Sequence, residues 1–167
     1  MYLLLGCNDL SYEVARYLRG QGEEVVIVDA NPRVVELSGW EVKVGDPRDP
    51  LVLQEAGIER ADGVLISYFD LKDTLSILRT VTRLKRELKK DVTILALVPD
   101  KMLEQDFRTM GASSVIGVSQ ALGAELVKEF QKAKQRQFER NLRTLLTENP
   151  GGKLSLIHIS EPTRPRL

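Results

Sequence analysis

The sequence predicts an α/β fold with a doubly wound parallel sheet of about six strands, followed by a long amphipathic helix. Short apolar runs alternate strictly with segments of helical periodicity, and the connections between them are short. The run at 24–28 places four apolar, β-favouring residues in succession, which is typical of a strand buried on both faces of a parallel sheet.

The elements follow one another in a regular order. Asn31-Pro32 and Asp49-Pro50 are typical helix starts, with a capping side chain before a proline. Gly20, Gly57 and Gly111 each follow a helical pattern and end it. The predicted strands are 2–5, 24–28, 41–44, 63–67, 92–98 and 114–117. The predicted helices are 11–20, a short one from 32, one from 50 to Gly57, 71–88 and 101–110. The expected inner face of the helix 71–88 comprises Leu75, Leu78, Val81, Thr82 and Leu88.

A long amphipathic helix is predicted over 121–147. Its apolar stripe is longer than the preceding sheet can cover, so we expect a partner subunit or a following domain to cover the far part. Cations crowd the remaining surface. The stripe comprises Leu122, Leu126, Phe130, Phe138, Leu142 and Leu145.

Composition excludes several classes of protein. The 167 residues carry equal numbers of acidic and basic side chains, and the basic helix lacks interleaved aromatics, so we expect no nucleic-acid partner. No apolar run approaches the roughly 20 residues that a membrane helix needs. Cys7 is the only cysteine, which excludes an internal disulfide. We therefore expect a cytoplasmic protein.

A candidate nucleotide site lies where the predicted strands end. Gly6 opens a loop after the first strand, and Asp29 ends the second, as in a Rossmann-like dinucleotide-binding unit. The loop amides and a helix N-terminus would face a phosphate, and Asp29 would accept ribose hydroxyls, favouring NAD over NADP. The cationic side chain of Arg33, close by in the sequence, could nevertheless bind a phosphate beside Asp29. The candidate residues are Gly6, Cys7, Asn8, Asp9, Leu10, Asp29, Ala30, Arg33, Gly45, Asp46, Ser67 and Tyr68. No catalytic or metal-binding set is visible.

Each candidate also has a purely structural interpretation. Gly6 could be an ordinary turn glycine, and Ser67 an ordinary loop serine. Asp46 could form a turn instead of lining the crevice. Cys7 lies beside a helix N-terminus that could lower its thiol pKa, but a small loop residue without a nucleophilic role is the preferred interpretation.

Residues 2–118 resemble the RCK N-terminal domain, also called TrkA-N. The resemblance rests on Gly6-x-Asn8, on Val28-Asp29, on the run VGDPRDP at 44–50, on the pattern at 53–62 (Leu-x-x-Ala-Gly-Ile-x-x-Ala-Asp) and on Met110-Gly111-Ala112. It implies a regulatory domain of potassium channels and transporters that binds NAD(H) or an adenine nucleotide (ATP, ADP or AMP). It also implies a dimer, here through the sheet edge and the C-terminal helix.

Three positions depart from the family's pattern. Asn8 and Ser11 stand where the family usually has glycine, and Thr74 stands where it usually has asparagine. Asn8 tolerates the left-handed conformation, so it could keep the turn. Its side chain would nevertheless crowd a pyrophosphate, and Ser11 would loosen helix packing unless it caps the helix.

The end of the chain carries a second resemblance. The long basic helix followed by residues 149–155 resembles the connector, in some microbial proteins, between a TrkA-N domain and a DHH-family phosphoesterase domain. The tail at 154–164 resembles the translation of a transposase-type sequencing adaptor, so we expect the native frame to be cut near Lys153. The expected divisions are 1–118 for the nucleotide-binding domain, 119–148 for the connector helix and 149–167 for a linker and a non-native tail.

These observations leave several functions open. The first is a regulatory nucleotide-binding module whose partner is a membrane potassium transporter subunit. The second is the sensor half of a truncated phosphoesterase, with a following catalytic domain. An NAD-dependent oxidoreductase is disfavoured because no substrate domain is visible in the sequence, although Tyr68 and Lys72 have the Tyr-x-x-x-Lys spacing. The last alternative is a domain that has lost nucleotide binding and only mediates contacts between subunits.

Overall fold

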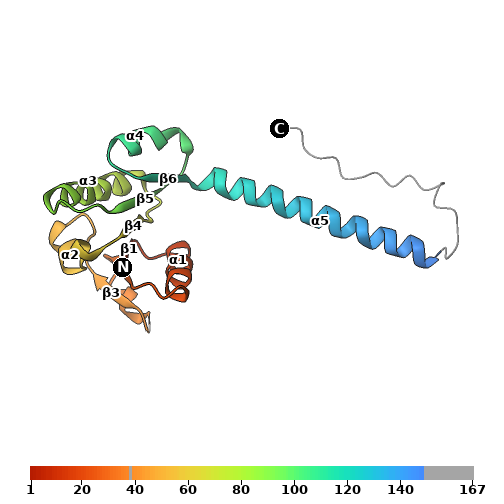
Figure 1. The fold of residues 1–167 in the computed structure, drawn as a ribbon, viewed down its shortest axis with the longest axis horizontal. Helices are drawn as coiled ribbons and strands as arrows, with labels where there is room; N and C mark the ends of the chain where they lie inside the picture. Colours follow the sequence, from red (N-terminus) through yellow and green to blue (C-terminus); the bar gives the residue numbers. More distant parts are fainter. Residues whose placement is uncertain (38, 149–167) are drawn as a thin grey trace. The chain divides into compact units, whose positions relative to one another are not determined.

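The computed structural model describes residues 1–37 and 39–148, and it confirms the predicted fold class (Figure 1). Six parallel strands form one sheet in the order β3-β2-β1-β4-β5-β6. The expectations for 149–167 lie outside the described residues. The strands are β1 (Tyr2–Leu5), β2 (Val25–Asp29), β3 (Glu41–Val44), β4 (Gly63–Ile66), β5 (Thr93–Val98) and β6 (Ser114–Gly117).

The helices match the prediction in order and differ from it at their ends. The predicted helix 101–110 divides into a 3₁₀ turn and a short α-helix. The α-helices are α1 (Asp9–Gly20), α2 (Pro50–Glu55), α3 (Leu71–Glu87), α4 (Glu104–Thr109) and α5 (Val118–Glu148). The 3₁₀ turns are η1 (Pro32–Glu36), η2 (Ile58–Arg60) and η3 (Lys101–Leu103).

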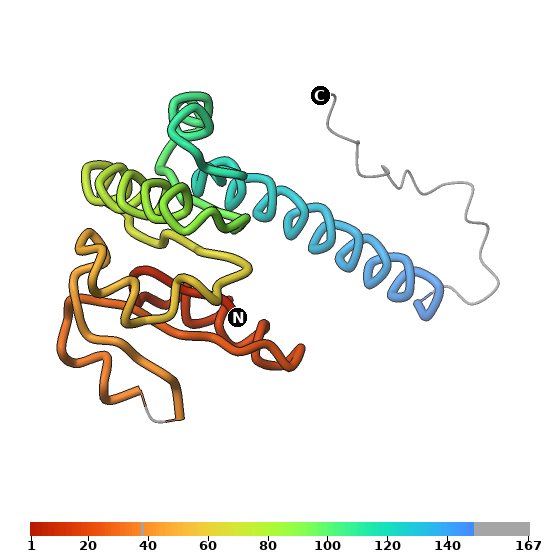
Figure 2. The backbone as a smooth tube through the Cα atoms, turned by 60° about the vertical axis from the view of Figure 1, so that its left-hand side comes forward, coloured from red at the N-terminus to blue at the C-terminus, as the bar shows by residue number. Residues whose placement is uncertain are grey.

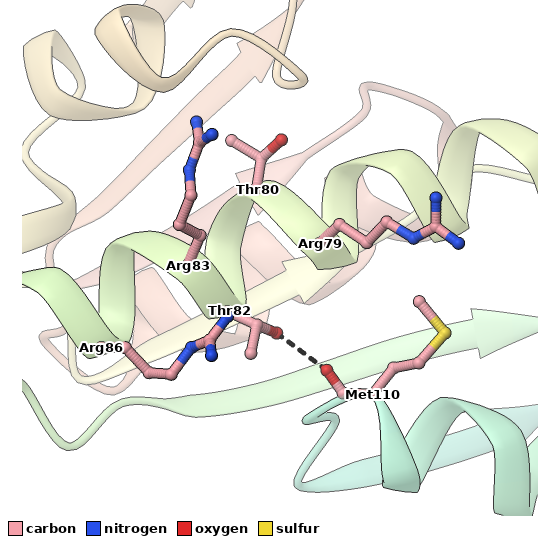
Figure 3. A pocket seen from close by; sticks show the side chains of 6 residues that line it. All are labelled: Arg79, Thr80, Thr82, Arg83, Arg86 and Met110. Carbon is pink, nitrogen blue, oxygen red and sulfur yellow. Dashed lines mark hydrogen bonds between the residues drawn. The ribbon is translucent and has the colours of Figure 1, made fainter.

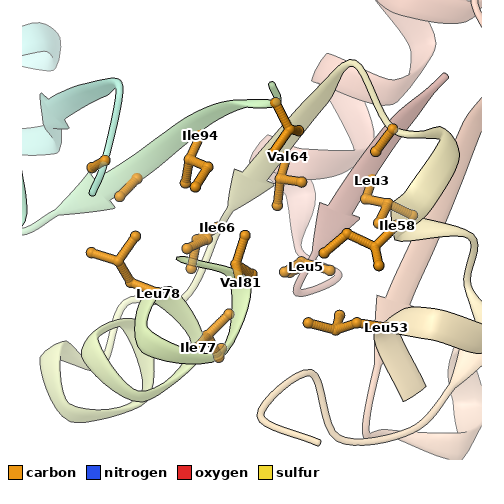
Figure 4. Close-up of a cluster of buried hydrophobic side chains, with 14 of the residues drawn as sticks. Leu3, Leu5, Leu53, Ile58, Val64, Ile66, Ile77, Leu78, Val81 and Ile94 are labelled. Atoms are coloured by element: carbon orange, nitrogen blue, oxygen red, sulfur yellow. The ribbon is translucent and has the colours of Figure 1, made fainter. Parts of the chain in front are cut away.

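The core has two layers because the central strands are buried on both faces. In β1, Leu3 and Leu5 point into one cluster, which α2, α3 and α4 cover, while Leu4 points into the other, which α1 covers. Figure 4 shows the first cluster between α3 and the sheet. Alternate side chains of β2 divide in the same way. The apolar run at 24–28 thus marks a doubly covered parallel strand.

The chain divides into two compact units, Met1–Gln120 and a second that begins at Ala121. Element α5 is one uninterrupted helix (Figure 2), and none of its residues is buried. Phe130, at 68% exposure, is the most open of its large apolar side chains. No helix among the described residues is both long and apolar enough to cross a membrane.

Candidate functional site

The carboxyl ends of β1, β2 and β4 meet at one edge of the sheet. Leu5 pairs with Val28 on one side and with Ile66 on the other. The residues that follow these strands are therefore neighbours, although they are distant along the chain. The central strand β1 contributes the loop, and its two partners contribute Asp29 and Ser67.

Gly6 makes the turn that starts the loop. Its φ is +101°, a region that side-chain-bearing residues rarely adopt. A Cβ built there would lie 2.7 Å from the Ser67 carbonyl oxygen and 2.8 Å from the Tyr68 ring. The turn requires glycine for both reasons, and Tyr68 lies against its backbone.

Asp29 ties the loop to the second strand. Its Oδ2 accepts a hydrogen bond from the Cys7 amide at 2.7 Å, and its Oδ1 accepts one from the Asn31 amide at 2.8 Å. Both carboxylate oxygens are thereby oriented, and each keeps acceptor capacity for another donor. A hydroxyl of a bound sugar is a donor of the required kind.

Asn8 and Ser11, the two positions at which glycine was expected from the resemblance, form a capping box. The Asn8 side chain accepts from the Ser11 amide at 3.0 Å, and the Ser11 hydroxyl accepts from the Asn8 amide at 2.9 Å. Helix α1 consequently begins at Asp9, two residues earlier than predicted. Asn8 is the N-cap, and Ser11, the third helical residue, contributes to capping through its hydroxyl as the other half of the capping box.

Asn8 also binds the neighbouring strand end. The side-chain amide nitrogen of Asn8, Nδ2, donates to the Ser67 carbonyl at 2.7 Å and lies 3.0 Å from the Ser67 hydroxyl. Asn8 has φ −147°, so the left-handed conformation considered for it is not used, and Gly6 alone makes the turn. The loop is pinned to β4 by a side chain that glycine lacks.

The start of α1 retains two backbone donors. The amides of Cys7, Asn8 and Ser11 donate within the loop or to Asp29. Among the described residues no acceptor is found for the amides of Asp9 and Leu10, the first two of the helix. Two free amides at the positive end of a 12-residue helix form an arrangement that attracts a phosphate.

The turn after β3 adds charge to the same edge. The Arg48 guanidinium donates to both carboxylate oxygens of Asp46, the closest contact being 2.8 Å, and reaches Asp73 at 3.4 Å. The hydrogen bonds from Arg48 lower the pKa of the Asp46 carboxyl. Asp46 is therefore ionised at neutral pH, and its charge is partly neutralised by its neighbour.

Cys7 and Tyr68 remain protonated at neutral pH. Burial, and then the charges of Asp29 and Asp9, raise the pKa of the Cys7 thiol. The thiol is not activated by the helix N-terminus, which contradicts that interpretation. Burial also raises the pKa of the Tyr68 phenol, followed by the charges of Asp29 and Asp46. Tyr68 can therefore act as a neutral hydrogen-bond donor.

The structure brings together most of the candidate residues but not all. The amide of Gly45 donates to the Asp29 carbonyl at 2.9 Å, which joins the third strand end to the site. Leu10, Ala30 and Arg33 are exposed, and Leu10 contributes only its backbone amide. No hydrogen bond in the described part of the chain joins the Arg33 side chain to the site.

Sequence reasoning missed Arg48 and Asp73. An acid followed two positions later by arginine within a turn was the available signal for the Asp46–Arg48 pair. Nothing in the sequence indicated that Asp73, in the first turn of α3, would lie within reach of Arg48. No cluster of potential metal ligands occurs among residues 1–37 and 39–148.

Comparisons with known proteins agree with this architecture. The model of the TrkA-N domain family matches residues 2–118. The NAD(P)-binding domain of an exopolyphosphatase-related protein from Archaeoglobus fulgidus has a TM-score of 0.68 at 24% identity. The match covers 78% of this chain and 97% of that one.

Two further structures were solved with nucleotides. The GsuK channel bound to NAD has a TM-score of 0.65 at 24% identity, over 75% of this chain and 22% of that one. The Shewanella denitrificans Kef CTD in its AMP-bound form has a TM-score of 0.61 at 20% identity, over 88% and 95% of the two chains. No curated protein sequence matches the chain.

Proposed function

The chain belongs to the TrkA-N domain family, and from this premise we propose that its first unit is a regulatory module that binds NAD(H) or an adenine nucleotide without turning it over. The nucleotide would lie against the carboxyl ends of β1, β2 and β4. A phosphate would meet the start of α1, and a ribose would meet Asp29.

One observation carries this proposal. The two free amides at Asp9 and Leu10 share one strand edge with a carboxylate that is already oriented by the Cys7 and Asn31 amides. Donors for a phosphate are thus present at the start of α1, after β1, and acceptors for a sugar hydroxyl at the end of the adjacent strand β2. The related GsuK and Kef structures contain NAD and AMP, respectively, which supports the same class of ligand.

Two substitutions of equal charge should change affinity in opposite directions. Asp29→Asn weakens the acceptor for ribose, so binding of NAD or AMP should fall about tenfold, as expected for loss of a charge-assisted hydrogen bond. Asp9→Asn removes an exposed negative charge from the phosphate end of the site, so binding should strengthen.

Calorimetry with NAD, NADH, ATP, ADP and AMP measures both effects. NADP should bind more weakly than NAD, because its 2′-phosphate would approach the Asp29 carboxylate. If the wild-type chain binds none of these nucleotides, the site has only a structural role. Oxidation or reduction of the nicotinamide would instead favour an oxidoreductase.

We further propose that the module acts on potassium transport as a dimer on the cytoplasmic side of a membrane transporter subunit. The GsuK channel and the Kef C-terminal domain support this partner class. The exposed stripe on α5, together with a sheet edge, would supply the dimer contact. Leu126 is 53% exposed and Phe130 is 68% exposed, which leaves apolar surface for a second chain.

Analytical ultracentrifugation tests the dimer. Leu126→Asp places a charge in the proposed contact and should shift the chain to monomer. Gln135→Asp, an exposed polar position away from the start of the stripe, is the matched control and should leave association unchanged. A monomeric wild type, or equal effects of the two variants, would contradict a contact through α5.

A second candidate is the sensor half of a DHH-family phosphoesterase. It is favoured by the similarity to a domain of an exopolyphosphatase-related protein. Sequencing the source locus beyond the codon for Lys153 distinguishes the candidates. A frame that continues into a strand followed by aspartate and histidine clusters would support the phosphoesterase and remove the potassium transporter as the partner.

A further inference from the structure

A shallow groove runs along α3, and none of the proposed nucleotide-site residues lines it. It consists of two hollows of about 440 and 420 Å³ that share Thr82 and Arg86. The first hollow extends to Arg79 and Met110, and the second extends to Lys90. All of these residues belong to the first unit.

The groove exists because the end of α4 approaches α3 very closely. The Thr82 hydroxyl donates to the Met110 carbonyl at 3.1 Å. Gly111 has φ +111°, and a Cβ built there would lie 2.7 Å from the Thr82 side chain. This contact divides the groove into its two hollows. Figure 3 shows Arg79 and Arg86 on either side of it, with Arg83 pointing away from Met110.

The groove concentrates positive charge in a chain that is neutral overall. Residues 79–90 include six cationic side chains and one acidic side chain, Glu87. Lys85 lies 3.6 Å from Asp91, and Arg83 lies 3.8 Å from Glu87. Four other cations of the segment have no ion-pair partner among the described residues. They are Arg79, Arg86, Lys89 and Lys90.

The spacing of the cations along α3, including Arg83 with its long contact to Glu87, indicates the shape of the missing partner. Arg79, Arg83 and Arg86 recur every three or four residues and therefore share one side of α3, and Lys90 lies just beyond the end of this helix. At a rise of 1.5 Å per residue the three arginines alone span about 10 Å along the helix. One small anion cannot reach all of them, whereas an elongated polyanion can.

The surface between the charges favours a peptide over a bare polyphosphate. Met110, the Thr82 methyl group and the aliphatic stems of the arginines and lysines line the groove. A peptide offers apolar side chains to this surface, and a polyphosphate offers none. No aromatic side chain lines either hollow, so single-stranded nucleic acid lacks stacking partners. A concave groove also suits a segment better than a flat membrane.

We propose that this groove binds an acidic segment of a partner protein, with glutamates or aspartates spaced to meet Arg79, Arg83, Arg86 and Lys90. Guanidinium groups bind carboxylates through two parallel hydrogen bonds, which gives such a contact direction as well as charge. The proposal is independent of nucleotide binding, because none of these residues belongs to the proposed nucleotide site.

The test uses fluorescence anisotropy with a labelled helical peptide whose glutamates alternate at spacings of three and four residues. Its counterpart with glutamine at those positions is the peptide control. The triple substitution Arg79→Gln, Arg83→Gln and Arg86→Gln should weaken binding at least about tenfold at low salt, by analogy with other charged contacts. A matched triple substitution on α5, Arg136→Gln, Arg140→Gln and Arg143→Gln, should change it by less than about twofold.

Several outcomes would overturn the assignment. Equal losses in the two triple variants would indicate general electrostatic attraction. Tighter binding of inorganic polyphosphate or of anionic vesicles than of the peptide would assign the groove to another ligand. Self-association that the α3 variant abolishes and the α5 variant preserves would assign it to a second copy. The arginines lie on the surface, so unchanged circular dichroism and thermal unfolding should confirm that both variants fold.

Discussion

Helices α3 and α5 are both long, basic and amphipathic, yet the structure uses them in opposite ways. Helix α3 buries Thr74, Ile77, Leu78, Val81 and Leu84, whereas α5 buries no residue. An apolar stripe therefore predicts a helix and a face, but it does not say what covers that face. The stripe of α3 is covered by the sheet, and the stripe of α5 is available to another chain.

The largest expected difference is in the effect of removing one leucine from each helix. Leu78→Ala leaves a cavity in the closed core and should lower the free energy of unfolding by about 2–5 kcal/mol. In the dissociated chain, Leu126→Ala should change it by less than about 0.5 kcal/mol, because this side chain is 53% exposed. Urea unfolding at a protein concentration at which the chain is monomeric measures both. Similar losses for the two leucines would mean that α5 is packed within a monomer.

Glycines offer a smaller contrast of opposite sign. Gly111→Ala forces a Cβ against Thr82 of α3 at positive φ and should cost about 1–3 kcal/mol. Gly123 lies inside α5, and a Cβ added there would have nothing within 4 Å, so Gly123→Ala should stabilise the helix by about 0.5–1 kcal/mol. Thermal unfolding followed by far-ultraviolet circular dichroism reports both changes. Destabilisation by both alanines would contradict an open surface around Gly123.

The smallest expected effects concern ion pairs and pH. Arg48 lowers the pKa of Asp46, so this pair stabilises the fold above the ordinary aspartate pKa and loses its contribution as pH falls through the lowered value. Both side chains are about half exposed, so Arg48→Gln should lower the free energy of unfolding only slightly at neutral pH. The difference in the free energy of unfolding between the variant and the wild type should disappear at acidic pH.

Helix α5 supplies the control for this titration. Lys132 lies 3.2 Å from Glu129 within the same helix, with both side chains exposed. Lys132→Gln should cost less than about 0.5 kcal/mol. Urea titrations at neutral and acidic pH compare the two variants. If the stability difference between Arg48→Gln and the wild type grew at acidic pH, the pair would not stabilise the fold through ionised Asp46, and the prediction would be wrong.

The sequence was sufficient for element order, parallel strands and most residues at the strand ends. Its errors were local. The inner face expected for α3 includes Leu88, which is 39% exposed, and omits Leu84, which is almost fully buried. Helix α1 begins at Asp9 because Asn8 caps it, although a motif based on glycine draws attention to Ser11. More than one polar residue near the start of a helix can cap it, and here Asn8 also contacts Ser67 after the neighbouring strand.

By itself, the sequence determined the alternation of strands and helices, because hydrophobic periodicity and caps are local properties. Only the tertiary structure decided which distant groups meet: Asn8 with Ser67, Arg48 with Asp73, and Thr82 with Met110. Such contacts depend on the register of neighbouring strands and on how closely two backbones approach. No local pattern encodes either quantity, so the pinned loop and the basic groove emerged only from the folded chain.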